Sequence, residues 1–384
     1  MADILKLNAI SPLADKFFEN DSYGNNVADP HGIMVRSADM KNYKVGDNLL
    51  AVARAGAGTN NIPVADYAQK GIVVFNTPGA NANAVKELVL CELFLGGRKI
   101  TDAIDWVKTL KGCDDLSKTV EKGKSSFAGC EIMFKTLGVI GLGAIGIAVA
   151  NAAIALGMKV IGCDPFLSTA NALLLNPSVK VVPTCEQVYA LSDFITVHVP
   201  LNDKTKGMFN EPALNAMKDG AVLINNSRAE LVDADAVIKA LNSGKLARYI
   251  TDFPLDKLIG VENAICVPHL GASTYEAEDN CAIMAAKQLK EYLDDGIITN
   301  SVNYPTVTSP REGKARICIC HKNIANMIAS YTAAVSSKGL NIANMVNKSK
   351  GDYAYCIVDV DGDADESLAK EIAAIDGVIR VRII

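Results

Sequence analysis

Several polar side chains that can transfer protons or bind anions follow consecutive apolar runs in the second half of the chain. Arg228 follows the run at 221–225, Asp252 and Asp256 follow the run that ends at 251, and His269 follows Val267 and Pro268. Ligands of open α/β sheets bind at the carboxyl ends of strands. A histidine there can move a proton, and an arginine can bind a carboxylate. The spacing predicts proton transfer on an anionic substrate, although a lone histidine beside an apolar run is more often a packed loop residue.

A glycine motif, GLGAIG at 141–146, stands between a predicted strand at 136–140 and a predicted helix at 147–156. The first glycine permits a tight turn, the second lets the backbone approach a pyrophosphate, and the third lets the helix pack closely on the strand. The start of such a helix presents free N–H groups to phosphates. The motif in this context predicts a dinucleotide site.

An acidic residue, Asp164, ends the next predicted strand 18 residues after Gly146. This is where an acid binds the ribose hydroxyls, and no arginine follows to accept a 2′-phosphate, so NAD is favoured over NADP. The alternative is that Asp164 caps a loop. The expected cofactor contacts are Gly141, Gly143, Ala144, Ile145, Gly146, Asp164, His198, Pro200 and Asp252.

The order of these motifs, from the glycine-rich turn through NNSR and DFPLD to PHLGAST, resembles the D-2-hydroxyacid dehydrogenases. In that family a histidine is the acid and base, an acid pairs with it, and an arginine binds the substrate carboxylate and carbonyl. The resemblance assigns these roles to His269, Asp256 and Arg228. The family usually has glutamate where this chain has Asp256, which is one methylene shorter. Ala229 replaces a usual glycine.

Two arginine-containing loops and the stretch NTPGAN at 76–81 resemble the branch of the family that oxidises D-3-phosphoglycerate. Arginine suits phosphate because its planar guanidinium donates forked hydrogen bonds. The alternative is that both arginines are solvated loop charges. The expected substrate contacts are Arg36, Ser37, Arg54, Ala55, Gly56, Ala57, Gly58 and Asn81.

The segment after residue 314 has the predicted order strand, helix, strand, strand, helix, strand, a ferredoxin-like βαββαβ unit of about 70 residues. It resembles an ACT domain, a family whose paired copies often bind amino acids. The resemblance implies contacts from His321, Asn323 and Asn341 to L-serine as a feedback inhibitor. Asn and His are also common at the turns between strands, so both explanations stay open.

The elements that must position these residues alternate between strand and helix, which predicts an α/β fold with parallel sheets covered on both faces. There are enough strands for two doubly wound, Rossmann-like domains. We expect a substrate domain at 1–97 with a return segment at 275–305, an NAD domain at 98–274, a polar linker at 299–312 and the ACT-like module at 314–384.

Composition narrows the classes of function. A net charge of −5 argues against a nucleic-acid or anionic-membrane surface. The uncharged run at 137–158 is long enough for a bilayer, but its glycine spacing fits a strand, turn and helix. Ten scattered cysteines without a C-x-x-C motif, and a start without the features of a secretory signal, predict a reduced cytoplasmic protein. Cys318, Cys320 and His321 could form half a metal site, but the two cysteines alternate with Ile317 and Ile319 as in a strand, so we expect no metal.

The activity that the resemblance implies is NAD-dependent oxidation of D-3-phosphoglycerate to 3-phosphohydroxypyruvate in a homodimer or homotetramer. Two alternatives remain at this stage. One is a dehydrogenase of the same family for another 2-hydroxy acid, such as glycerate or erythronate-4-phosphate. The other is an NAD-sensing binding protein, as in the C-terminal binding protein corepressors, which keep the fold and the same polar residues.

Overall fold

A computed structural model describes all 384 residues and divides them into two compact units. Unit 1 comprises residues 1–81 and 275–384, and unit 2 comprises residues 82–274. None of the helices combines the length and apolar character needed to cross a bilayer.

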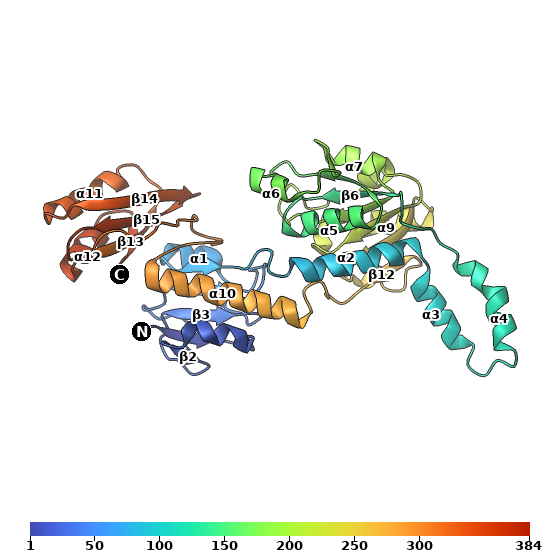
Figure 1. The fold of residues 1–384 in the computed structure, drawn as a ribbon, viewed down its shortest axis with the longest axis horizontal. Coiled ribbons are helices and arrows are strands. Elements are labelled where there is room, and N and C mark those ends of the chain that lie inside the picture. Colours follow the sequence, from blue (N-terminus) through green and yellow to red (C-terminus); the bar gives the residue numbers. More distant parts are fainter. The chain divides into compact units, whose positions relative to one another are not determined.

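Unit 1 contains a five-stranded parallel sheet in the order β2-β1-β3-β4-β5, as in flavodoxin-like folds. The strands are β1 (Asp3–Lys6), β2 (Ser22–Gly24), β3 (Gly32–Val35), β4 (Ala51–Arg54) and β5 (Val73–Phe75). They are short and apolar because both faces are covered. The helix α10 (Tyr275–Asp295) packs on one face with the 3-10 helix η1 (Pro12–Phe18), and the other face packs on α1 (Val64–Gln69) (Figure 1).

Unit 2 contains a seven-stranded parallel sheet in the order β12-β11-β10-β9-β6-β7-β8. The strands are β6 (Thr136–Ile140), β7 (Lys159–Cys163), β8 (Lys180–Val181), β9 (Phe194–Val197), β10 (Ala221–Asn225), β11 (Leu246–Thr251) and β12 (Ala264–Cys266). The chain order reverses direction between β6 and β9, which is the switch point where a Rossmann fold binds its dinucleotide.

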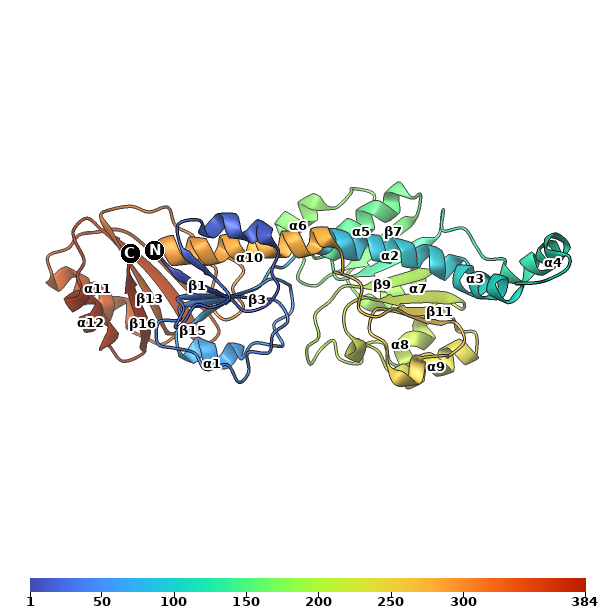
Figure 2. The ribbon, with the colours of Figure 1, turned by 90° about the horizontal axis from the view of Figure 1, so that it is seen from below.

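Helices cover both faces of this second sheet (Figure 2). One face packs on α2 (Ala82–Gly97) and α5 (Ala144–Ala155), and α6 (Thr169–Leu174) adjoins α5. The other face packs on α7 (Cys185–Leu191), α8 (Glu211–Ala216) and α9 (Ala234–Asn242), with the 3-10 helices η3 (Ala229–Leu231) and η4 (Asp256–Leu258) nearby. The predicted doubly wound arrangement is therefore confirmed for this unit.

The predicted boundary at residue 97 is one helix too late, because α2 packs on α5, β10 and β11 of unit 2. Its apolar residues Val85, Val89 and Leu93 join the core of that unit. The apolar sequence of α2 does not reveal which sheet the helix covers.

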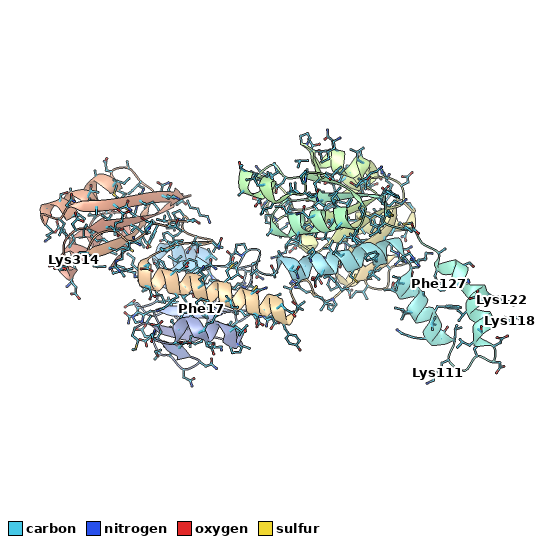
Figure 3. The ribbon with its side chains drawn as sticks, viewed as in Figure 1. Phe17, Lys111, Lys118, Lys122, Phe127 and Lys314 are labelled. Atoms are coloured by element: carbon cyan, nitrogen blue, oxygen red, sulfur yellow. The ribbon has the colours of Figure 1, made fainter.

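A segment of three short helices follows α2, and none of the residues in these helices is buried. It consists of α3 (Ile100–Thr109), α4 (Leu116–Gly123) and η2 (Lys124–Phe127), and Lys111, Lys118, Lys122 and Phe127 mark its course in Figure 3. Ile104, Val107 and Leu116 are each about half exposed or more. These apolar side chains have little packing within this chain.

The C-terminal module has the predicted order of elements: β13 (Ala315–Lys322), α11 (Met327–Ser337), β14 (Ile342–Lys350), β15 (Tyr353–Val360), α12 (Glu366–Ala373) and β16 (Val378–Ile383). Its antiparallel sheet has the order β14-β15-β13-β16. One face packs on α11 and α12. The other face, which carries Cys318, Cys320, Tyr355 and Ile357, shares a core with α10, so the module is part of unit 1.

The segment predicted as a polar linker is packed against unit 1 over most of its length. Asn303 accepts a hydrogen bond from Val74 N at 2.9 Å and donates to Ile72 O, and the Tyr304 hydroxyl donates to Ala68 O at 2.7 Å. The Asn303 side chain and the backbone N–H of Val302, which donates to Val74 O at 2.9 Å, satisfy the free edge of β5, so this edge is closed. The prediction of a linker missed the segment because the residues that bind the edge are polar.

Candidate functional site

The three glycines of the nucleotide loop meet different surroundings in unit 2. Gly141 has a φ of +91°, and a Cβ on Gly146 would lie 1.9 Å from the carbonyl oxygen of Gly141. Gly143, by contrast, has nothing within 4 Å of its would-be Cβ. The first and third glycines are thus required by the turn and by the contact of α5 with β6. The second leaves open space beside the helix start at Ala144 and Ile145, which fits the pyrophosphate of a dinucleotide.

Asp164 lies at the end of β7, beside this loop. Its Oδ2 accepts a hydrogen bond from Leu142 N at 2.9 Å, and its Oδ1 accepts one from Phe166 N at 2.8 Å. The carboxylate therefore couples the glycine loop to the position where a ribose diol would bind. The bond from Phe166 N is a local cap, as the alternative explanation for Asp164 expects.

His198 and Pro200 follow β9, the strand beside β6. The His198 N–H donates to Ile140 O at 2.7 Å, and the ring Nε2 lies 3.0 Å from Thr196 Oγ1. Burial lowers the pKa of His198 to about 4, so the ring is neutral at pH 7. Its Nδ1 has no partner, while Pro200 is exposed and accepts a hydrogen bond from Thr205. His198 borders the glycine loop, because its carbonyl oxygen lies 2.5 Å from the would-be Cβ of Gly141.

The side chains of Arg228 and His269 meet at one aromatic ring. The Arg228 guanidinium carbon lies 5.7 Å from the centre of the Phe253 ring, and the His269 ring centre lies 4.7 Å from it. Arg228 Nη1 also donates to Ser227 O at 2.6 Å. Because both polar side chains are exposed and share Phe253, the structure brings the predicted cation and base together at the ends of β10 and β12.

Asp252 holds the loop that carries His269. Its Oδ1 and Oδ2 accept hydrogen bonds from the backbone N–H of Leu270 at 2.5 Å and of Gly271 at 2.8 Å, while its carbonyl oxygen accepts from His269 N at 3.1 Å. His269 has a φ of +58°, which is uncommon for a residue other than glycine. The buried carboxylate thus fixes a conformation that the backbone does not favour by itself.

Asp256 lies exposed at the first position of η4, and no hydrogen bond or ion pair joins it to His269. The neighbouring Lys257 pairs instead with Asp235 at 2.7 Å. Of the two acids after β11, Asp252 is occupied by backbone N–H groups and Asp256 has a carboxylate that is accessible.

A buried acid that the sequence analysis missed lies behind this site. Glu92 of α2 is 0% exposed, and its Oε2 accepts a hydrogen bond of 2.6 Å from the side-chain amide of Asn226. Burial raises the pKa of Glu92 to about 8; the bond from Asn226 opposes the rise, and the charge of Asp252 adds to it. A charged residue within the apolar helix run VLCELFL was the available signal.

The two arginines predicted to bind an anion lie at the ends of neighbouring strands in unit 1. Arg36 follows β3 and Arg54 ends β4, where Val35 pairs with Arg54 in register. Arg36 forms an ion pair of 2.5 Å with Glu278, and Arg54 Nε donates to Asn61 Oδ1 at 3.1 Å. Burial raises the pKa of the Cys281 thiol, and the positive charges of Arg54 and Arg36 partly offset this rise. Both guanidinium groups therefore lie close enough to Cys281 to affect the same thiol. Ser37 Oγ accepts a hydrogen bond from Asn8 at 3.1 Å.

The loop at 55–58 continues from Arg54. A Cβ on Gly56 would lie 2.3 Å from Arg54 Nη1, so the guanidinium lies directly over this glycine. Ala55 is buried, whereas Ala57 is exposed and accepts a hydrogen bond from Asn76 Nδ2 at 2.6 Å. Asn81 Oδ1 is buried without a partner. This loop therefore offers backbone groups and one guanidinium.

The three residues predicted to contact serine have partners within the module. The His321 ring is buried, with Nδ1 2.7 Å from Lys322 O and Nε2 2.9 Å from Asn347 Oδ1. Asn323 Nδ2 donates to Gly351 O at 3.0 Å, and Asn341 Nδ2 donates to Asp361 Oδ2 at 2.6 Å. The two asparagines are exposed turn residues.

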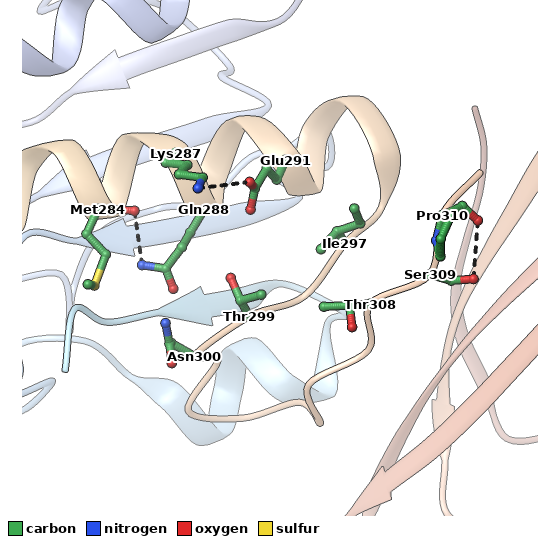
Figure 4. A pocket seen from close by; sticks show the side chains of 10 residues that line it. All are labelled: Met284, Lys287, Gln288, Glu291, Ile297, Thr299, Asn300, Thr308, Ser309 and Pro310. Carbon is green, nitrogen blue, oxygen red and sulfur yellow. Dashed lines mark hydrogen bonds and ion pairs between the residues drawn. The ribbon is translucent and has the colours of Figure 1, made fainter. Parts of the chain in front are cut away.

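Unit 1 also contains a cavity of about 560 Å³ beneath α10 (Figure 4). The Gln288 amide nitrogen donates to Met284 O at 3.1 Å, and Lys287 pairs with Glu291 at 3.8 Å beside it. The other residues that line the cavity are Ile297, Thr299, Asn300, Thr308, Ser309 and Pro310. None of the predicted site residues lines this cavity.

Comparisons with known proteins show which chains this protein is similar to. Residues 98–271 match the family described as "D-isomer specific 2-hydroxyacid dehydrogenase, NAD binding domain". The D-3-phosphoglycerate dehydrogenase of Haemophilus influenzae is 32% identical and aligns over 96% of this chain and 90% of its own length. The enzyme of the same name from Escherichia coli K12 is 30% identical over 95% of this chain and 90% of its own length.

Among solved structures, the NAD+-bound 3-phosphoglycerate dehydrogenase of Entamoeba histolytica is 26% identical, with a TM-score of 0.61, and covers 78% of this chain and 98% of its own. The glycine loop, the acid after β7 and the strand-end arginine and histidine are thus found in a chain that aligns with dehydrogenases along nearly its whole length. The chain therefore belongs to the NAD-dependent D-isomer-specific 2-hydroxyacid dehydrogenase family.

Proposed function

We propose that the protein oxidises D-3-phosphoglycerate to 3-phosphohydroxypyruvate with NAD, the first step of serine biosynthesis. The observation that carries the choice of substrate is the pair of arginines at neighbouring strand ends of unit 1, Arg36 and Arg54. A 2-hydroxy acid without a phosphate needs one arginine for its carboxylate, which Arg228 supplies. The names of the aligned relatives support the same substrate.

His269 takes the proton of the C2 hydroxyl group at a ring nitrogen, while Arg228 binds the carboxylate and stabilises the developing carbonyl oxygen. When bound, NAD supplies the acceptor for the hydride from C2. Phe253 contacts both side chains, and Asp252 holds the backbone of the histidine loop. Asp256, whose carboxylate has no other partner, stabilises the imidazolium.

The phosphate group binds Arg36 and Arg54. Arg36 is 41% exposed and its ion pair with Glu278 is accessible to solvent, so a phosphate dianion competes for this guanidinium at small cost. Arg54 is positioned over Gly56, where no Cβ blocks the approach of an anion. Ser37 and the backbone at 55–58 complete the group of donors.

The experiment follows NADH absorbance with 3-phosphoglycerate and NAD, and in reverse with 3-phosphohydroxypyruvate. Arg54→Ala is expected to lower kcat/KM for phosphoglycerate by about 10-fold to 100-fold, as the loss of a charged hydrogen bond costs about 1.5–3 kcal/mol. Turnover of glycerate should not change, and His269→Ala should abolish both activities.

No turnover in either direction by a protein that still binds NADH would refute the assignment. Turnover of another 2-hydroxy acid, such as erythronate-4-phosphate, would identify a different dehydrogenase of the family. NADH-dependent capture of a protein partner without any turnover would indicate a sensor of the corepressor type.

We further propose that the C-terminal module is an ACT domain that binds L-serine as an inhibitor. Its βαββαβ order and antiparallel sheet support the assignment. Because His321 is buried against Asn347, contact with serine falls to the exposed Asn323 and Asn341. Serine should inhibit the wild type and not Asn341→Ala; equal inhibition of both would remove Asn341 from the site.

We also propose a homo-oligomer in the cytoplasm. The ten free cysteines suit a reducing compartment. The apolar side chains on α3 and α4 have few partners in one chain and suit burial against a second copy. Light scattering should give a dimer or tetramer, and Val107→Glu should shift the distribution towards monomer.

A further inference from the structure

Two cysteine thiols lie in contact next to the nucleotide site. The sulfur atoms of Cys163 and Cys185 are 3.0 Å apart, although 22 positions separate them in the chain. Cys163 ends β7 and Cys185 begins α7. Since β8 pairs with β7 in parallel and Val182 N donates to Gly162 O at 2.8 Å, the sheet itself returns the chain to the end of β7. Among the ten cysteines this is the one sulfur–sulfur contact.

The two thiols differ in accessibility and acidity. Cys163 is 2% exposed, and its hydrogen bond to Cys185 together with burial raises its pKa. The same hydrogen bond lowers the pKa of Cys185, against opposing effects of burial, Glu186 and Asp164. Cys185 is partly exposed. The pair therefore consists of a partly exposed cysteine whose pKa is lowered and a buried thiol in contact with it, as in reversible redox sites.

We propose that Cys163 and Cys185 form a redox-modification site, in which a hydroperoxide produces a disulfide that weakens NAD binding. The inference rests on the NAD site of the family and not on the identity of the hydroxy acid.

The reaction balances with the peroxide as the only oxidant. The Cys185 thiolate attacks the peroxide, an S–O bond forms as the O–O bond breaks, and the released alkoxide takes a proton to become an alcohol. The Cys163 sulfur then attacks Cys185, an S–S bond forms as the S–O bond breaks, and hydroxide leaves with the Cys163 proton as water. Two thiols lose two electrons, and the peroxide is reduced.

The link to the cofactor is Asp164, the residue directly after Cys163. A disulfide bond is about 2.05 Å long, so the sulfurs must approach by about 1 Å. This movement acts on the end of β7, where the Asp164 carboxylate holds Leu142 of the glycine loop at 2.9 Å. Displacing that carboxylate disturbs the groups that fit the ribose and the pyrophosphate.

The test uses the reduced full-length protein, treated with hydrogen peroxide and then with an alkylating reagent. Peptide mass spectrometry should find the peptides of Cys163 and Cys185 joined, with the loss of two hydrogens. NADH fluorescence titration should give a Kd several-fold higher than for the reduced protein, and dithiothreitol should restore it.

Cys185→Ser should form no cross-link and keep its NADH affinity under peroxide, with thermal unfolding as the check on its fold. Cys163→Ser should instead accumulate sulfinic acid at Cys185, because no thiol resolves the sulfenic acid. Cys130→Ser, which removes an exposed cysteine elsewhere, should behave as wild type. Oxidation of exposed cysteines without the cross-link, or a cross-link with unchanged NADH affinity, would overturn the proposal.

Discussion

The side-chain amide of Asn226 donates a 2.6 Å hydrogen bond to Glu92, a carboxyl group with no exposed surface. Glu92 Oε1 and Asn226 Oδ1 are both buried without a partner. A proton on Glu92 would allow the acid to donate to the amide oxygen, so the pair would make two hydrogen bonds. Burial raises the pKa of Glu92 to about 8, which favours this neutral form at pH 7. Asn226 stands two residues before Arg228, so the pair supports the arginine loop.

The first prediction concerns the stability of the wild type against pH. In the unfolded chain Glu92 loses its proton near 4.5, but in the folded chain it keeps the proton up to about 8. Between these values the folded state binds more protons, so the free energy of unfolding falls as pH rises. Relative to Glu92→Gln, which keeps the shape and does not titrate, the wild type should lose on the order of a few kcal/mol over this window.

Urea unfolding followed by circular dichroism across this pH range measures the difference. The stability curves of the two proteins should differ in slope between about pH 4.5 and 8, and they should run parallel above and below this window. Parallel curves for the two proteins throughout would show that Glu92 does not titrate in this window. Infrared spectra at neutral pH give a second test, because a protonated carboxyl band should be present in the wild type and absent from Glu92→Gln.

The second prediction is that Asp252→Asn impairs the histidine loop. An amide offers one oxygen where two backbone N–H groups, of Leu270 and Gly271, now bind a carboxylate. The loss should cost about 1–3 kcal/mol in the free energy of unfolding. Misplacement of His269 should lower kcat about 100-fold. Wild-type kcat in a variant with reduced stability would mean that the loop keeps its conformation without the charge.

The third prediction separates Asp256 from Asp252. The Asp256 side chain is exposed and makes no hydrogen bond or ion pair, so Asp256→Asn should leave the unfolding transition unchanged. It should lower kcat about 10-fold or more with little effect on KM for NAD, since the imidazolium loses its counter-charge. Asp256→Glu restores the longer family side chain and should retain or increase kcat. Full activity of Asp256→Asn would exclude this residue from proton transfer.

Local sequence signals predicted most elements, and the exceptions have clear reasons. The strands β3, β4 and β5 lie in apolar stretches of the sequence, because a strand covered on both faces is apolar nearly throughout. The edge strands β2 and β8 escaped prediction, since Ser22–Gly24 is short and polar and Lys180–Val181 has two residues, both exposed. Edge strands lack the burial that produces the pattern.

Some residues of the candidate site could be predicted from the sequence, and others could not. Gly141, Gly146 and Asp164 were found from spacing because backbone turns and close packing demand particular residue types. The sequence did not predict that Asp252 holds the histidine loop, because its partners are the backbone N–H groups of Leu270 and Gly271, and nearly every residue carries such a group. Nothing in the spacing showed that Phe253 touches both Arg228 and His269.

The sequence by itself determined the alternation of strands and helices, the nucleotide loop and the strand-end polar residues, because these depend on the order of residues within a few turns of chain. Only the tertiary structure decided that α2 packs in unit 2, that Glu92 is buried against Asn226, and that Cys163 touches Cys185. The last two contacts join residues that are 22 and 134 positions apart in the chain. Contacts between such distant residues produce no periodic pattern of apolar residues in the local sequence, so they cannot be predicted from it.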